Sequence, residues 1–187
     1  QLGHEAAEFS GQLFEQWCQS REFLLWLGAH FQTGERLSDA RVEAVLSAAQ
    51  AHSSRQQALL LMGAMIDFEL HLTHGDGRSV EEVCNDVQRT LTHLQLPDDH
   101  RFANGFDYMV TQYDASVYAY VWSNMLAQEA FKRFSRDWVF NAQTGREFRA
   151  TFFAPGAGRP LLDAVEAFVG RPVAGLVDGE AGLITSN

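Results

Sequence analysis

Residues 58–70 read Ala58-Leu59-Leu60-Leu61-Met62-Gly63-Ala64-Met65-Ile66-Asp67-Phe68-Glu69-Leu70 and carry a helical pattern. The apolar residues of this stretch recur at intervals of three and four, which places one apolar stripe on an α-helix: Leu59, Met62, Ile66 and Leu70. The uninterrupted apolar run ends before Asp67 and is about half of the roughly 20 residues that a helix needs to cross a bilayer. The stretch therefore predicts a core helix and no membrane span.

The composition predicts a folded acidic protein. Hydrophobic residues make up 46% of the 187 residues and aromatic residues 12%, so the chain can bury a core of its own. The formal net charge is −10, from 14 basic and 24 acidic residues. Because a nucleic-acid-binding protein needs a basic face, this balance argues against a nucleic-acid partner.

Helical spacing and capping residues extend along almost the whole chain and predict a mainly α, multi-helix domain. Ser38, Ser79, Asp114 and Asn141 are suitable N-caps, and Ser79 with Glu82 has the spacing of a capping box. We expect one domain over residues 1–172 and a loosely ordered tail over 173–187. The expected helices are 5–19, 21–31, 39–51, 55–73, 80–94, 114–135, 141–153 and 160–169.

The two cysteines, Cys18 and Cys84, stand far apart and have no paired spacing. We expect two reduced thiols rather than a disulfide.

Three polar side chains share one face of the first expected helix. Glu8, Gln12 and Glu15 lie at positions i, i+4 and i+7, while Phe9 and Leu13 make the remaining surface apolar. Such a stripe is either a solvated face or the wall of a polar cleft that binds a metal.

A cluster of tyrosines between residues 113 and 120 is the second polar feature. On a helix Tyr113, Val117 and Tyr120 would share one face, with Tyr118 on another. Phenol hydroxyls that face a cleft donate hydrogen bonds to developing negative charge. They are equally compatible with core residues whose hydroxyls reach the rim.

Together these segments resemble the thimet oligopeptidase family of zinc peptidases, which includes oligopeptidase A and dipeptidyl carboxypeptidase. The family's Val-Glu-x-Pro-Ser-Gln-x-x-Glu-x-Trp segment is matched by residues 7–17, and its Gly-Gly-Tyr-Asp/Ala-Ala-x-Tyr-Tyr-x-Tyr-Leu-Trp segment by residues 111–122. Further similar stretches lie at 30–35, 68–71, 131–134, 145–149 and 154–156. The resemblance implies the C-terminal half of such a catalytic domain.

The resemblance also implies roles for the polar residues. Glu8 occupies the position at which the family has its third zinc ligand. Tyr113 and Tyr120 occupy the positions of family tyrosines that line the site, and the resemblance implies that Tyr120 stabilises the oxyanion. Gln12, Glu15 and Tyr118 are candidate substrate-binding residues. The family takes two further zinc ligands from a His-Glu-x-x-His helix, a motif that does not occur between Gln1 and Asn187. Zinc is thus expected only if a partner segment completes the site.

Four departures from the family pattern bear on activity. The family's histidine falls on Tyr108 and its substrate-contacting tyrosine on Val117, while Gly-Gly becomes Thr111-Gln112 and Pro-Ser becomes Ser10-Gly11. Losing one oxyanion donor costs roughly 10²–10³ in turnover. We therefore expect a pseudoenzyme.

Two functions remain open at the level of sequence. The first is a peptidase-derived, non-catalytic subunit of a larger assembly, with another protein chain covering the face left by the missing peptidase half. The alternative is the C-terminal part of an active zinc oligopeptidase that hydrolyses short peptides once a separate chain or segment supplies His-Glu-x-x-His. The family implies an intracellular site, mitochondrial or cytosolic.

Overall fold

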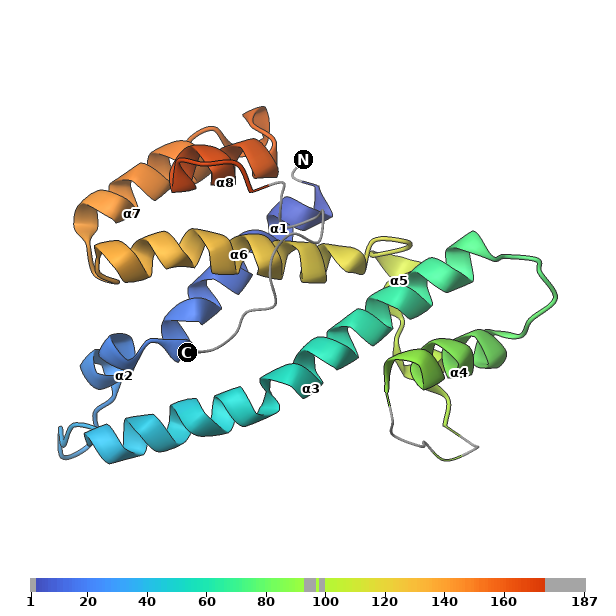
Figure 1. Ribbon diagram of the computed structural model, residues 1–187, viewed down its shortest axis with the longest axis horizontal. Helices are drawn as coiled ribbons and strands as arrows, with labels where there is room; N and C mark the ends of the chain where they lie inside the picture. Colours follow the sequence, from blue (N-terminus) through green and yellow to red (C-terminus); the bar gives the residue numbers. More distant parts are fainter. Residues whose placement is uncertain (1–2, 93–96, 98–99, 174–187) are drawn as a thin grey trace. The chain divides into compact units, whose positions relative to one another are not determined.

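A computed structural model describes residues 3–92, 97 and 100–173, and the regular elements among these residues are helices, with no strand (Figure 1). One isolated bridge joins Ala29 to Arg36. The mainly α prediction is confirmed. Within the described ranges, no helix is both long enough and apolar enough to pass through a lipid bilayer.

The chain divides into two compact units. Residues 38–122 form one, here called the middle unit, and residues 1–37 with 123–187 form the other, here called the outer unit. The boundary falls inside helix α6 (Tyr118–Asp137). The expectation of one domain over 1–172 stays a prediction. Of the expected tail, only Val173 is described, and it is buried; residues 174–187 lie outside the described ranges.

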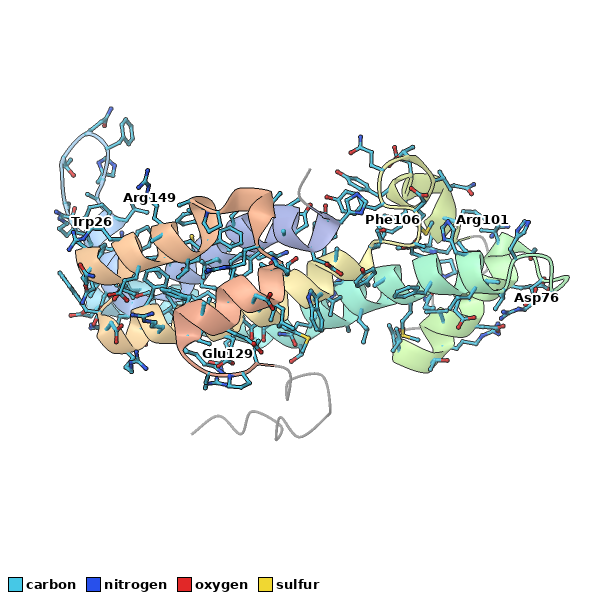
Figure 2. The ribbon with its side chains drawn as sticks, turned by 90° about the horizontal axis from the view of Figure 1, so that it is seen from above. Trp26, Asp76, Arg101, Phe106, Glu129 and Arg149 are labelled. Carbon is cyan, nitrogen blue, oxygen red and sulfur yellow. The ribbon has the colours of Figure 1, made fainter. Side chains whose placement is uncertain are left out.

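The middle unit is built on helix α3 (Asp39–Leu72). Helix α4 (Val80–Leu91) packs along the C-terminal half of α3, as Figure 1 shows. The short helices η2 (Phe102–Gly105) and α5 (Tyr108–Thr111) follow; Arg101 and Phe106 flank η2 (Figure 2). The core of this unit consists of Met62, Ala64, Ile66, Cys84, Val87, Met109, Tyr113 and Val117.

Helix α3 corrects the prediction of two helices, 39–51 and 55–73. Helix α3 is continuous from Asp39 to Leu72 (Figure 1). Within it, the Ser53 hydroxyl donates to the Gln50 carbonyl at 2.8 Å. A serine inside a helix satisfies its hydroxyl in this way, so it need not start a new helix. Other bounds also differ. Helix α2 (Arg21–Leu27) ends before residue 31, α4 ends at Leu91 and not at residue 94, and α6 begins after residue 114. Residues 93 and 94 lie outside the described ranges.

Three of the four predicted N-caps are confirmed. Ser38 accepts from the Arg41 amide, Ser79 forms the complete capping box with Glu82, and Asn141 accepts from the amides of Gln143 and Thr144. Asp114 is not a cap, because it lies in a turn and α6 begins at Tyr118.

The outer unit has an aromatic core. Phe9 and Phe168 are almost fully buried, and Phe148 lies 6.3 Å from Phe9 and 5.2 Å from Phe168 between ring centroids. Phe134 packs edge-on to Phe148 at 5.7 Å. The elements of this unit are α1 (His4–Glu15), η1 (Gln16–Gln19), α2, the rest of α6, α7 (Ala142–Phe148), the π-helical turn η3 (Arg149–Phe153), η4 (Gly156–Gly158) and α8 (Leu161–Val169).

Candidate functional site

The polar stripe of α1 lies beside two fully buried apolar residues. Phe9 and Leu13 are 0% exposed, so α1 is fixed to the core of the outer unit. Glu8 and Gln12 are half-buried and Glu15 is exposed. The structure thus holds Glu8 and Gln12 at the edge of a packed helix.

Gln12 is tied to α6 by a chain of side-chain amides. The Asn124 amide nitrogen donates to Gln12 Oε1 at 2.7 Å, and Gln128 donates to Asn124 Oδ1 at 2.6 Å. The buried Ser123 hydroxyl donates to the Glu5 carbonyl at 2.6 Å, one turn before Glu8. The sequence reasoning missed these α6 residues, because a polar residue on a helix does not reveal its distant partner.

Trp17 anchors the C-terminal end of the α1–η1 segment. Its ring packs edge-on to Phe131 at 4.8 Å and to Phe134 at 4.7 Å, and its indole N–H donates to the Val139 carbonyl at 3.1 Å. The tryptophan of the first motif is thus a structural residue of the outer unit.

The tyrosines gather around residues 113–117, here called the tyrosine turn. Tyr113 is buried at 9% exposure, and its ring centroid lies 5.2 Å from that of the half-buried Tyr120. Tyr118 departs from this pair and stacks on Phe68 of α3 at 5.3 Å. Tyr113 and Tyr120 are therefore brought together, as the spacing suggests, although Tyr113 precedes the helix instead of lying on it.

The tyrosine turn is hydrogen-bonded to a residue that the sequence reasoning did not identify. Asp67 of α3 is 0% exposed, and its carboxylate accepts from the backbone amides of Ala115 at 3.1 Å and Val117 at 3.0 Å. Ala115 has a φ of 53°, in the left-handed region that residues other than glycine rarely adopt. The signal available in the sequence was a lone carboxylate that ends an apolar run.

A catalytic zinc takes three protein ligands, and the described residues do not supply such a set. No group of three or more His, Cys, Asp or Glu side chains comes together within residues 3–92, 97 and 100–173. Glu8 is one potential ligand, and it belongs to the outer unit, whereas the tyrosine turn belongs to the middle unit. These residues alone do not fit the metal, and the roles of all six candidate side chains stay predictions.

Comparison with known proteins matches almost the whole chain. The model of peptidase family M3 matches residues 2–174. Oligopeptidase A of Escherichia coli is 28% identical over 170 residues, which is 89% of this chain and 25% of that protein. A protein of Arabidopsis thaliana named as a probable cytosolic oligopeptidase A is 31% identical over 175 residues, again 89% of this chain and 25% of that protein.

A second Arabidopsis thaliana relative, named as an organellar, chloroplastic/mitochondrial oligopeptidase A, is 31% identical over 175 residues, which is 89% of this chain and 22% of that protein. The chain thus spans about a quarter of the length of the relatives that it matches. The family match covers both the α1 segment and the tyrosine turn. This chain therefore belongs to peptidase family M3.

Proposed function

We propose that this chain is a peptidase-derived component that does not cleave peptides and that acts through contacts with another protein. The observation that carries the proposal is the burial of Val117. It stands where the resemblance places a substrate-contacting tyrosine, yet it is 2% exposed and belongs to the core of the middle unit. An isopropyl group in a packed core has no hydrogen to donate to a substrate.

The neighbouring departures support the same reading. Tyr108 replaces the family's histidine; its ring packs on Phe106 at 6.3 Å and on Tyr113 at 5.6 Å. A tyrosine offers one hydroxyl at this position in place of the two ring nitrogens of a histidine. Thr111 and Gln112 replace two glycines, which restricts the backbone that precedes the tyrosine turn.

Exposed aromatic side chains of the outer unit support a protein partner. Trp26 (Figure 2) is 58% exposed and Trp138 is 56% exposed, and both pack on Phe140, at 5.2 Å and 5.4 Å. A groove of about 410 Å³ nearby is lined by Phe14, Trp17, Phe140 and Phe153 among others. Exposed apolar patches of this kind are typical of protein interaction sites.

The alternative is a working zinc oligopeptidase, and the retained tyrosine pair favours it. Tyr113 and Tyr120 remain adjacent, and Glu8 remains at the edge of α1. In that case Glu8 would be one metal ligand, and a further segment would supply the others; the bound zinc would acidify a water molecule. Tyr120 would then donate its hydroxyl hydrogen to the developing oxyanion.

A cleavage assay on the native full-length protein decides between the two functions. Short peptides are incubated with the protein and zinc, with Glu8→Ala as the matched variant. We expect no cleavage above a blank treated with chelator. Chelator-sensitive cleavage that disappears in Glu8→Ala would establish the alternative.

An intracellular location accompanies the proposal. Its support is the names of two relatives, one described as cytosolic and one as chloroplastic/mitochondrial. Fractionation of cells that express the tagged full-length protein tests it, and recovery from the medium would contradict it.

A further inference from the structure

We propose that Asp67 is the positioning residue of the tyrosine turn, which determines how Tyr113 and Tyr120 are presented. The inference concerns only the placement of these side chains. It holds whether or not the protein cleaves peptides.

The Asp67 carboxylate is isolated from water. Asp67 lies in α3 among core residues and is 0% exposed. A buried carboxylate is tolerated when hydrogen-bond donors compensate for the lost hydration. Two of its donors are backbone amides of the turn, one on each oxygen: Ala115 on Oδ1 and Val117 on Oδ2. His71 Nδ1 lies 3.2 Å from Oδ1 and 2.8 Å from the Asp67 carbonyl oxygen.

The two hydrogen bonds from Ala115 and Val117 hold the backbone conformation of the turn. Ala115 adopts a φ of 53°, which a residue with a Cβ keeps only when its surroundings enforce it. The amides of residues 115 and 117 converge on the two oxygens of one carboxylate. Asp67 therefore enforces the conformation of Ala115.

Backbone hydrogen bonds connect the turn to Tyr113 and Tyr120. The Ser116 amide donates to the Tyr113 carbonyl at 2.9 Å, and the Tyr120 amide donates to the Val117 carbonyl at 3.2 Å. Tyr113 thus lies at one end of the turn and Tyr120 in the first turn of α6. A shift of Ala115 or Val117 would change the 5.2 Å separation of the two rings.

The test uses the full-length protein and four variants: Asp67→Asn, Ala115→Gly, their combination, and Asp114→Asn. The last is the matched control, because it makes the same chemical change at an exposed residue of the same turn. The readouts are residue-level hydrogen exchange of the backbone amides and the ring signals of labelled tyrosines. Neither readout depends on peptide cleavage, so failure of this inference is distinct from failure of the proposed function.

We expect slow exchange at Ala115 and Val117 in the wild type. Asp67→Asn should accelerate exchange at these two amides by about tenfold or more and shift the ring signals of Tyr113 and Tyr120. Adding Ala115→Gly should reverse part of the faster exchange and part of the signal shift, because glycine adopts a positive φ without the hydrogen bonds to Asp67. Asp114→Asn should change neither.

Three results would overturn the inference. They are equal acceleration throughout α3 and α4, an equal effect of Asp114→Asn, and absence of rescue by Ala115→Gly. If Asp67→Asn does not fold, the wild type still tests the inference. Fast exchange at Ala115 and Val117 in the folded wild type would show that their hydrogen bonds to Asp67 do not hold the turn.

Discussion

The side chain of Asn124 donates a hydrogen bond to Gln12 at 2.7 Å and joins helices α1 and α6 across 112 residues of sequence. Gln12 belongs to the motif that the resemblance places beside the metal site. Its amide oxygen is thus engaged within the protein, which makes Gln12 a structural residue of the outer unit as well as a candidate for substrate binding.

The Gln12–Asn124 pair should show measurable coupling. Gln12→Ala and Asn124→Ala should each lower the free energy of unfolding by about 1 kcal/mol, because each substitution removes the hydrogen bond of a half-buried polar partner. In a double-mutant cycle measured by urea unfolding, the coupling should be about 0.5–1.5 kcal/mol. Gln19→Ala, at an exposed position, is the control. Strict additivity of the two changes would contradict the hydrogen bond.

The aromatic core of the outer unit predicts a strong contrast between two phenylalanines. Phe9 is 0% exposed and packs on Phe152 at 4.8 Å, so Phe9→Ala should cost about 3–5 kcal/mol through the cavity that it leaves. Phe31 is 88% exposed, and Phe31→Ala should stay within about 0.5 kcal/mol of the wild type. Chemical unfolding measures both, and similar losses for the two variants would disprove this packing.

The capping box of α4 predicts a pH dependence of stability. The backbone amide and hydroxyl of Ser79 donate to Glu82 at 2.7 Å and 2.9 Å and hold the pKa of that carboxyl below its usual range. A lowered pKa in the folded state means that the stabilisation is complete above the unfolded value of about 4.3 and is lost as the pH falls through the folded value.

Glu82→Gln keeps a hydrogen-bond acceptor but does not titrate. Between pH 6 and about pH 3, across the ordinary glutamate pKa, the wild type should therefore lose more stability than Glu82→Gln. Thermal unfolding at a series of pH values measures the difference. Parallel profiles for the two proteins would rule out the titrating cap.

The two thiols should differ in reactivity. Both cysteines are free, as the sequence predicts; Cys18 is exposed, whereas Cys84 is buried in the middle unit, where burial raises the pKa of its thiol. Iodoacetamide should label Cys84 about tenfold more slowly than Cys18, or slower still, and equally fast only in urea. Mass spectrometry of the labelled peptides checks this, and equal labelling in buffer would contradict the burial of Cys84.

Local chemistry made much of the fold predictable. Three helices are capped by Ser38, Ser79 and Asn141. Each of these side chains accepts a hydrogen bond from a backbone amide two or three residues later, and that spacing is visible in the sequence. The same local reasoning failed between residues 51 and 55, where it predicted a break, because the Ser53 hydroxyl is satisfied within a continuous helix. A residue that can cap or continue a helix leaves the choice to tertiary packing.

The candidate site was predictable only in part. Periodicity and the family resemblance brought out Glu8, Tyr113 and Tyr120, since their positions recur in motifs. Asp67 was missed because its partners lie 48 and 50 residues away, and no periodic pattern connects them. The burial of Val117 likewise depends on packing between α3 and the tyrosine turn.

We propose that the protein does not hydrolyse peptide bonds, and native mass spectrometry of the full-length protein is the sharpest test of this proposal. Spectra recorded before and after incubation with zinc and a short peptide report metal content and peptide integrity together. We predict no tightly bound zinc and an intact peptide. One bound zinc per protein, together with peptide cleavage that a chelator prevents, would contradict it.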